Sequence, residues 1–446
     1  MMQKNIAPKN FDEAVQFSLE QLPMFSKQGK TALKPTLDNI IRFCNHLGNP
    51  EKQFKSLHIA GTNGKGSTSN ILAATFQIAG YKTGLYTSPH LIDIRERIRI
   101  NGELIKKDDF VSFIQDNWQF IKEIQPSYFE LNVAMAFWYF AKEKVDIAII
   151  ETGLGGTWDS TNIILPELSV ITNISLDHTN ILGNTIEEIS ASKAGIIKPN
   201  TPVVIGINQK ETAKVFSKTA ILNNTTLVYA DLLFQFAITG NDIFNQKIKF
   251  FDNRTFEAFE LETDLLGNYQ LENIRTALTA IIILESKGWN VNFTTFKEAI
   301  QQVKKLTGLR GRWDKLQREP LLIADVGHNP SGLGLVAEQL NHSALKNKTK
   351  HIVTAFVSDK DVKQALSFLP QNALYYLSEA KIPRAMPLSN LAAIASDLKL
   401  NFKTFPSIAA ALETALKNAS KDDLVLITGS FFTVAEGLEY FDQINK

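Results

Sequence analysis

The sequence predicts an α/β protein made of two domains, each with a mostly parallel sheet that is covered by helices. Short apolar runs alternate with amphipathic stretches, which is typical of parallel strands joined by helices. The chain has 446 residues, whereas a single hydrophobic core stops growing at ~250–300 residues. The periodicity is interrupted over residues 304–312, where two glycines stand. We therefore expect one domain over residues 1–306 and a smaller one over residues 307–446.

The elements of the first domain follow from its apolar runs and turn residues. A buried strand at 57–60 precedes a glycine-rich turn and a helix over 67–78, with Gly80 as its C-cap. The segment 230–262 is rich in Phe and Asn and alternates in polarity, which predicts antiparallel hairpins at the sheet edge. An amphipathic helix is expected over 269–286. Further buried strands are expected at 83–87, 145–150, 168–172 and 202–205.

The second domain repeats this alternation on a smaller scale, beginning with a buried strand at 321–324. Its other strands are expected at 352–357, 373–377 and 424–428, and its helices at 333–340, 362–368 and 408–417. This order of strands and helices predicts a Rossmann-like α/β domain.

Composition and charge exclude several classes of protein. Hydrophobic residues make up 44% and charged residues 21% of the chain, as in ordinary globular proteins. The formal charge of +1 provides no basic field for nucleic acid or anionic lipid. The sequence starts without the apolar core of a signal peptide, and no apolar run reaches the ~20 residues of a membrane helix. The lone cysteine, Cys44, is expected to be a buried thiol. We expect a soluble, cytoplasmic protein with no nucleic-acid or membrane partner.

The sharpest local signal is the segment 60–67, AGTNGKGS, between the first strand and its helix. Glycines let backbone N–H groups point at phosphate oxygens, the helix N-terminus adds a favourable dipole, and Lys65 adds a mobile positive charge. The segment departs from the standard phosphate loop, because Ile59 replaces its first glycine and Gly66 replaces the hydroxyl residue after the lysine. A turn without a ligand is the alternative. The preceding strand and the lysine favour a phosphate-loop ATPase-like first domain.

Two further polar side chains are expected at the carboxyl edge of the same sheet. The strand at 145–150 runs into Glu151, and an acid at that position orients Mg²⁺ in nucleotide-binding sheets. Glycines at 153, 155 and 156 keep other side chains away from it. His178 follows the strand at 168–172 and should open onto the same edge. The alternatives are a solvent-exposed acid and a structural histidine.

Ten short motifs follow one another between about residues 55 and 431. They occupy residues 61–67, 87–91, 128–130, 151–156, 176–179, 192–196, 310–313, 325–330, 359–361 and 429–431. In order and spacing they resemble the motifs of the folylpolyglutamate synthase and dihydrofolate synthase family, relatives of the Mur ligases that build the cell-wall peptide. The resemblance implies an ATP-dependent ligase that forms amide bonds.

For ATP, the resemblance implies contacts from both domains. Lys65 and the surrounding amides would hold the β- and γ-phosphates. Asp325 would bind the ribose and Arg312 a phosphate, while Asn273 and His328 would lie near the base. The segment of Asp325 could instead form a turn and a helix cap. The complete set of ATP-binding candidates is Thr62, Asn63, Gly64, Lys65, Gly66, Ser67, Asn273, Arg312, Asp325 and His328.

The resemblance also implies a Mg²⁺ site and a modified lysine. Ser88 and Glu151 would ligate the metal, with His178 also reaching it. Lys193 matches a position where the family carries a carbamylated lysine, whose anion can bind or orient a metal, whereas an unmodified cation near Mg²⁺ is unfavourable. The alternative for Lys193 is a solvated helix residue. Lys65, Lys193 and His178 are the residues expected to act in catalysis.

The expected reaction is ligation of L-glutamate through an acyl phosphate. The resemblance implies that Pro89, His90, Phe129 and Glu130 line a pocket for the pterin of dihydropteroate or tetrahydrofolate. It also implies that Arg384 faces the incoming glutamate. We favour a bifunctional enzyme that adds glutamate to dihydropteroate and extends the folate tail. An enzyme that only extends the tail remains the alternative. The resemblance suggests a monomer.

Two other classes fit the sequence less well. A cell-wall peptide ligase should carry an additional N-terminal domain, and only sixty residues precede Gly61. A phosphate-loop switch or motor protein would need a hydroxyl directly after Lys65, and it would not explain the second α/β domain.

Overall fold

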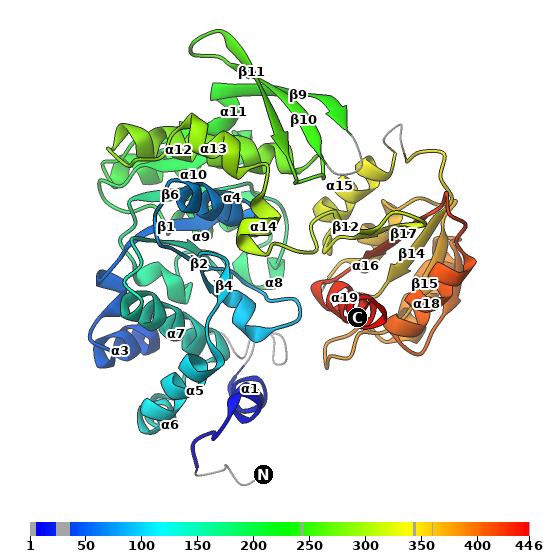
Figure 1. The fold of residues 1–446 in the computed structure, drawn as a ribbon, viewed down its shortest axis with the longest axis horizontal. Helices are drawn as coiled ribbons and strands as arrows, with labels where there is room; N and C mark the ends of the chain where they lie inside the picture. The colour runs from blue at the N-terminus through cyan, green and yellow to red at the C-terminus, as the bar shows by residue number, and fades with distance from the viewer. Residues whose placement is uncertain (1–5, 24–35, 242–244, 342–344, 359, 446) are drawn as a thin grey trace. The chain divides into compact units, whose positions relative to one another are not determined.

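The computed structural model describes residues 6–23, 36–241, 245–341, 345–358 and 360–445 (Figure 1). The predicted α/β class is confirmed, and the described residues form two compact units. The first unit comprises Met1–Ala237, Ile248–Glu262 and Glu272–Gly308, and the second comprises Ile238–Lys247, Thr263–Leu271 and Leu309–Lys446.

An eight-stranded sheet forms the centre of the first unit, in the order β4-β3-β2-β5-β1-β6-β7-β8. Its strands are β1 (Lys55–Ala60), β2 (Thr83–Tyr86), β3 (Ile98–Ile100), β4 (Glu103–Leu104), β5 (Ile147–Glu151), β6 (Leu168–Ile171), β7 (Val203–Ile205) and β8 (Leu227–Tyr229). Strands β2, β5, β1, β6, β7 and β8 are parallel to one another. Strands β3 and β4 extend the sheet beyond β2 with antiparallel pairing. All five strands predicted for this sheet are present, and the short strands β3, β4 and β8 were not predicted.

Helices cover this sheet and connect its strands. They are α1 (Phe11–Glu20), α3 (Asp38–His46), α4 (Lys65–Ile78), α5 (Lys107–Asp116), α6 (Trp118–Ile124), α7 (Tyr128–Lys142), α8 (Thr179–Leu182), α9 (Ile186–Ala194), α10 (Lys210–Leu222), α11 (Ala230–Leu233), α12 (Gln270–Ser286), α13 (Phe293–Ala299) and α14 (Val303–Thr307), with 3₁₀ turns η2 (Pro50–Lys52), η3 (Ile94–Arg97) and η4 (Ser160–Ile163). Helix α4 is buried along most of its length because it packs between the sheet and the helices α13 and α14. At its end Gly80, with φ +88, follows the C-cap Ala79.

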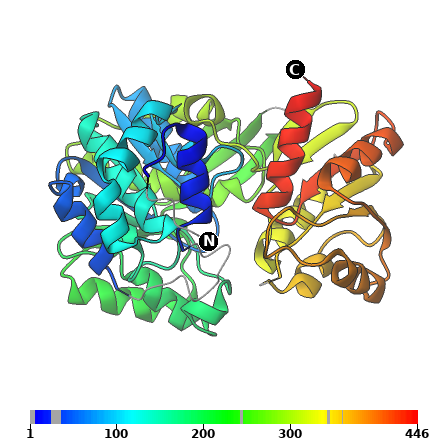
Figure 2. The same ribbon diagram turned by 90° about the horizontal axis from the view of Figure 1, so that it is seen from below.

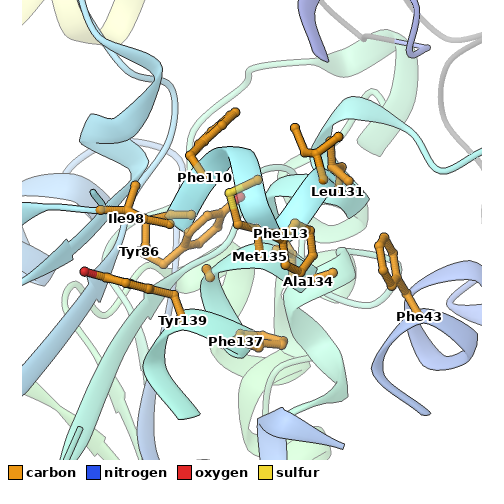
Figure 3. Close-up of a cluster of buried hydrophobic side chains, with 14 of the residues drawn as sticks. Phe43, Tyr86, Ile98, Phe110, Phe113, Leu131, Ala134, Met135, Phe137 and Tyr139 are labelled. Carbon is orange, nitrogen blue, oxygen red and sulfur yellow. The ribbon is translucent and has the colours of Figure 1, made fainter. Parts of the chain in front are cut away.

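The main core of the first unit lies where α7 packs on the sheet and against α3 and α5 (Figure 3). Phe137 and Met135 of α7, Phe113 of α5 and Phe43 of α3 are fully buried in it. Burying one such side chain contributes roughly 1.5–3 kcal/mol. Cys44 is also buried, as expected. Helix α1 packs against α5 (Figure 2).

The segment predicted to form hairpins at the sheet edge departs from the prediction. It starts with the short helix α11 and continues as β9 (Phe234–Asn241), β10 (Gln246–Asp252) and β11 (Glu257–Thr263), which form a separate three-stranded sheet. The aromatic side chains on these strands pack on one another and on α13: Phe250 stacks on Phe259 with centroids 5.7 Å apart, and Phe259 meets Phe293 at 4.6 Å. The predicted position at the edge of the eight-stranded sheet was therefore wrong, because the strands form a separate sheet whose aromatic rings pack against α13.

The second unit contains a six-stranded sheet in the order β12-β13-β17-β14-β15-β16. Its strands are β12 (Asp314–Gln317), β13 (Leu321–Ala324), β14 (Lys350–Thr354), β15 (Leu374–Leu377), β16 (Asn401–Thr404) and β17 (Leu424–Thr428), and its helices are α15 (Pro330–Leu340), α16 (Val362–Ser367), α17 (Leu388–Asp397), α18 (Ile408–Asn418) and α19 (Phe431–Ile444). Only the edge strand β12 is antiparallel to its neighbour. All predicted strands and helices are present, and β14 begins two residues earlier than predicted.

Across the described ranges, no helix has both the length and the apolar character needed to cross a bilayer.

Candidate active site

Four groups of candidate residues in the first unit lie at or after the ends of four adjacent parallel strands. Ser88 follows β2, Glu151 ends β5, the glycine-rich loop of residues 61–64 follows β1, and His178 follows β6. In the sheet, Glu151 lies level with Ile59 of β1. Because parallel strands end at the same edge, the topology gathers these groups at the carboxyl edge of the sheet, where α/β proteins bind their ligands.

The glycine-rich loop is held by the segment that follows β6. The N–H groups of Thr62 and Asn63 donate to the backbone oxygen and the side-chain oxygen of Asn173, at 2.8 and 3.0 Å. The Thr172 hydroxyl donates to the Asn63 carbonyl at 2.6 Å. These bonds occupy the first amides of the loop. The amides from Gly64 onward are the leading N–H groups of α4, which lack acceptors inside the helix.

Two glycines of the loop are required by geometry. Gly61 has φ +146, and a Cβ there would lie 1.9 Å from the Thr172 hydroxyl oxygen. Gly64 has φ +85 and precedes α4, and a Cβ there would lie 2.1 Å from the side-chain oxygen of Asn273 on α12. Asn273, 4% exposed, thus packs against the loop at the start of α4. Its expected place near the nucleotide base stays a prediction.

The two lysines of the site converge on one carbonyl. The Lys193 amine on α9 donates to the Gly61 oxygen at 2.7 Å, and the Lys65 amine donates to the same oxygen at 3.2 Å. Lys193 is buried at 4% exposure, so it is not the solvated helix lysine of the alternative. Burial, and then the charge of Lys65, lower the pKa of Lys193 to about 7. Near neutral pH a large fraction of this amine is therefore uncharged and nucleophilic.

Glu151 and Ser88 meet at the end of their strands. The Glu151 carboxylate is buried at 3% exposure and accepts a hydrogen bond from the Ser88 backbone N–H at 3.2 Å. The peptide bond between Ser88 and the exposed Pro89 is cis. No group of three or more His, Cys, Asp or Glu side chains is gathered in the described part of the chain. A cation here would therefore depend on one carboxylate, hydroxyl or imidazole groups, and ligand oxygens.

His178 has a left-handed backbone, φ 49, and precedes the short helix α8. Its N–H donates to the Asp177 carboxylate at 2.8 Å, and its Nε2 lies 4.0 Å from that carboxylate. Its ring is therefore held beside an acid at the edge of the sheet.

The pocket candidates differ in what they contact. The Phe129 ring lies against Gly153, where a Cβ would come within 2.4 Å of it. The Glu130 carboxylate completes a capping box by accepting from the N–H of Ser127 at 2.6 Å at the start of α7. The His90 ring accepts a hydrogen bond from Arg97 at 2.9 Å. Burial, and then the charge of Arg97, lower the pKa of His90 to about 3, so its ring stays neutral.

Asp159, which was not predicted from the sequence, shapes the glycine-rich turn after Glu151. The buried Asp159 carboxylate accepts from the N–H groups of Gly153 and Leu154, both at 2.8 Å, and from Thr161. Burial raises the pKa of this carboxyl. The Thr161 hydroxyl also contacts the buried His58 ring of β1 at 2.8 Å. An acid a few residues after a run of glycines was the available signal, since short acids commonly bind turn amides.

In the second unit, Asp325 follows β13 and is buried at 3% exposure. Its carboxylate accepts from the Tyr269 hydroxyl and from the N–H groups of Trp313 and Gly327, the latter two at 2.8 Å. Burial raises the pKa of this carboxyl above its usual range. The neighbouring Asn329 caps α15 by accepting from a backbone N–H at 2.7 Å. The structure therefore contains the turn and the helix cap that were considered as the alternative role of this segment.

Arg312 and His328 lie at the same edge of the second sheet. The Arg312 guanidinium lies over the ring of Phe431, with its carbon 4.9 Å from the centroid, and the His328 ring lies 5.6 Å from the same centroid. Arg384 lies on the loop after β15, where its carbonyl accepts from the N–H of Ser358 at 2.9 Å.

A parallel sheet that brings a lysine-bearing loop, an acid and a buried lysine to one edge defines a nucleotide-dependent enzyme of the α/β class. Two family descriptions match the chain. The Mur ligase middle domain matches residues 59–281, and the Mur ligase glutamate ligase domain matches residues 311–431.

Relatives and solved structures narrow the class. A dihydrofolate synthase/folylpolyglutamate synthase of Bacillus subtilis is 32% identical over 420 residues, which cover 91% of this chain and 95% of the relative. A probable bifunctional folylpolyglutamate synthase/dihydropteroate synthase of Haloferax volcanii is 31% identical over 91% of this chain, and the match spans only 48% of that longer protein. Escherichia coli FolC, solved in complex with DHPP and ADP, superposes with a TM-score of 0.86 at 28% identity, covering 99% of this chain and 100% of the other. Thermotoga maritima folylpolyglutamate synthase gives 0.78 at 29% identity, covering 92% and 94%.

The chain belongs to the dihydrofolate synthase/folylpolyglutamate synthase family of Mur ligases, whose members are ATP-dependent ligases that form amide bonds.

Proposed function

We propose that this protein uses ATP to join L-glutamate to the carboxyl group of a pteroate or folate. The observation that carries the proposal is the convergence of Lys65 and Lys193 on the Gly61 carbonyl, at the sheet edge where Glu151 ends its strand. The Lys65 cation and the N-terminal dipole of α4 suit the charge of a transferring phosphoryl group, and the adjacent acid can hold the metal that accompanies it.

In the proposed first step, the acceptor carboxylate attacks the γ-phosphoryl group and ADP leaves. Lys65 and the leading amides of α4 stabilise the phosphate charge. The step also requires that the carboxylate, and not water, attacks the phosphoryl group. In the second step, the amine of L-glutamate attacks the acyl phosphate, and an amide and phosphate form. The chain then supplies orientation and charge and needs no nucleophile of its own.

The residues of the edge fit a Mg²⁺ ion. Mg²⁺ prefers oxygen ligands and commonly keeps waters and nucleotide phosphates, so one or two protein oxygens are sufficient. The buried carboxylate of Glu151 with Ser88 beside it meets this requirement. We propose that Ser88 and Glu151 hold the ion with help from His178. When bound, the metal neutralises charge on the phosphates.

The environment of Lys193 supports its carbamylation. Addition of CO₂ requires a neutral amine and releases a proton, and the lowered pKa of about 7 provides that amine. The product N–H can still donate to the Gly61 carbonyl, and the new carboxylate gains the nearby Lys65 as a counter-charge. We propose that the Lys193 carbamate orients the metal or the acceptor.

For the acceptor, we propose that Phe129 faces the pterin together with Pro89 and His90. Glu130 contributes through the capping box that fixes the start of α7, the helix that carries Phe129. The B. subtilis relative is named as a dihydrofolate synthase/folylpolyglutamate synthase, and a relative from Lacticaseibacillus casei as a folylpolyglutamate synthase. We favour the bifunctional form, and tail extension alone is the competing activity.

We propose nucleotide contacts in the second unit as well. Arg312 would bind a phosphate, His328 would lie near the base, and Arg384 would face L-glutamate. A carboxylate has about four acceptor positions. Hydrogen bonds from described residues use three of those on Asp325, and we propose that the fourth accepts from a ribose hydroxyl. We further propose a functional division near residue 306/307, a monomer, and a cytoplasmic location.

The test is L-glutamate-dependent ADP release from Mg-ATP, with 7,8-dihydropteroate in one reaction and tetrahydrofolate in another. Release with both acceptors is expected of the bifunctional enzyme. Release with tetrahydrofolate alone would reduce the activity to tail extension. Release with neither, from folded protein supplied with bicarbonate, would contradict the proposal and favour a cell-wall peptide acceptor.

A further inference from the structure

Phe431 is the first residue of α19 and lies beside two candidate nucleotide ligands of the second unit. The Arg312 guanidinium carbon is 4.9 Å from the centroid of its ring. The His328 ring centroid is 5.6 Å away, with the ring planes at 58°. One aromatic side chain thus contacts both groups that would meet the nucleotide.

The backbone around Phe431 is fixed by its sequence. Gly429 follows β17 with φ +108, and a Cβ there would lie 2.3 Å from the Thr354 hydroxyl oxygen, so only glycine makes this turn without strain. The Ser430 hydroxyl then accepts from the Thr433 N–H at 3.0 Å and caps α19. Phe431 is therefore held at a defined point of the sheet edge.

Backbone hydrogen bonds join the three segments that carry Phe431, His328 and Arg312. The Gly429 N–H donates to the Gly327 carbonyl at 3.0 Å. The Val326 N–H donates to the Gly311 carbonyl, also at 3.0 Å. The three segments that bring side chains to the ring are therefore held together by backbone hydrogen bonds and are not independent loops.

The ring has a reason to be there besides core packing. Phe431 is half-buried and is not among the buried hydrophobic side chains of the described residues. A guanidinium over an aromatic face is attracted by the ring quadrupole and loses rotamer freedom before a ligand arrives. An arginine held in this way loses less entropy when it binds phosphate.

We propose that Phe431 is a positioning residue for the nucleotide, with its ring holding the Arg312 guanidinium and confining the His328 ring. The inference rests on the proposed nucleotide roles of Arg312 and His328 and adds a residue that touches neither phosphate nor base. Loss of the cation–ring contact should weaken nucleotide binding about five- to tenfold.

The experiment measures Mg-ATP binding by calorimetry without any folate, together with the KM values for ATP and for the acceptor. F431L removes the aromatic face and keeps an apolar side chain, and F431Y keeps the face. F432L is the matched control, because Phe432 is the next residue of α19 and is also half-buried. R312A and the double variant R312A/F431L complete a cycle.

The expected result is a five- to tenfold higher Kd and KM for ATP in F431L, an unchanged KM for the acceptor, and values within twofold of wild type for F431Y and F432L. In the R312A background, F431L should add less than twofold. Equal losses in F431L and F432L, or a full F431L effect without Arg312, would overturn the inference. Normal ATP binding by R312A would overturn it too. ATP binding without glutamate-dependent turnover would instead count against the proposed function.

Discussion

The environment of Lys193 leads to a prediction that can be worked from the structure. Lys65 and Lys193 donate to one carbonyl oxygen at 3.2 and 2.7 Å, so their nitrogens are at most about 6 Å apart. Two unit charges at that distance repel by about 3 kcal/mol at an effective dielectric constant of about 20. This energy corresponds to about two pH units of the Lys193 pKa. Replacing Lys65 by methionine removes the repulsion and leaves the burial.

The variant Lys65→Met should therefore hold Lys193 largely protonated at neutral pH. With the pKa near 7, about three quarters of the amine is neutral at pH 7.5, and a rise of about two units leaves about 3%. Because CO₂ adds only to the neutral amine, and because Lys65 also stabilises the carbamate, occupancy should fall at least tenfold. In the wild type, activity should fall below about pH 7 as Lys193 takes up a proton.

The assay is ¹³C NMR of the carbamate carbon in protein equilibrated with ¹³C-bicarbonate, which needs no turnover. Lys193→Arg supplies the spectrum without carbamate, and Lys65→Arg is the matched control that keeps the neighbouring charge. Occupancy should be high in wild type and Lys65→Arg and low in Lys65→Met. Equal occupancy in wild type and Lys65→Met, or equal loss in both Lys65 variants, would refute the reasoning.

Four further substitutions test three other parts of the site. Glu151→Gln should lower kcat about a hundredfold and raise the Mg²⁺ requirement, because one ligand charge is lost; unchanged Mg²⁺ dependence would exclude Glu151 as a ligand. Glu130→Ala should cost about 1 kcal/mol of unfolding free energy, measured in urea, by removing the capping box with Ser127, with the acceptor KM unchanged; a raised KM would instead make it a substrate ligand. Gly64→Ala should weaken ATP binding and cost about 1–2 kcal/mol for its left-handed backbone, and Asn273→Ala should relieve part of this loss by removing the clash; strict additivity would contradict that contact.

Much of the fold was predictable because its signals are local. The central strands of the two sheets, such as β1, β5, β6, β13, β14 and β17, are almost wholly buried, so they appear in the sequence as short apolar runs. The glycines and the lysine of residues 60–67 predicted both the turn after β1 and the helix that follows it. The separate sheet of β9, β10 and β11 was not predictable as such, since alternation predicts strands but does not say which surface covers them. The aromatic contacts with Phe293 decided that outcome.

The candidate site was predictable where a residue's position in the topology determines its surroundings. Glu151 and His178 were placed at one edge because parallel strands end together. The pairing of Lys193 with Gly61 was not visible, because 132 residues separate them. The partners of Asp325 and the ring contacts of Phe431 were hidden for the same reason, since both depend on loops brought together by the sheet.

The most direct test of the account is isotope transfer from the acceptor carboxylate. Dihydropteroate labelled with ¹⁸O in its carboxyl group is incubated with the enzyme, Mg-ATP and L-glutamate, and the released phosphate is examined by mass spectrometry. An acyl phosphate leaves one carboxylate oxygen on phosphorus when glutamate attacks the carbonyl carbon, so one labelled phosphate should appear for each amide formed. Amide formation with unlabelled phosphate, or ATP cleavage that does not depend on glutamate, would contradict the proposed ligase mechanism.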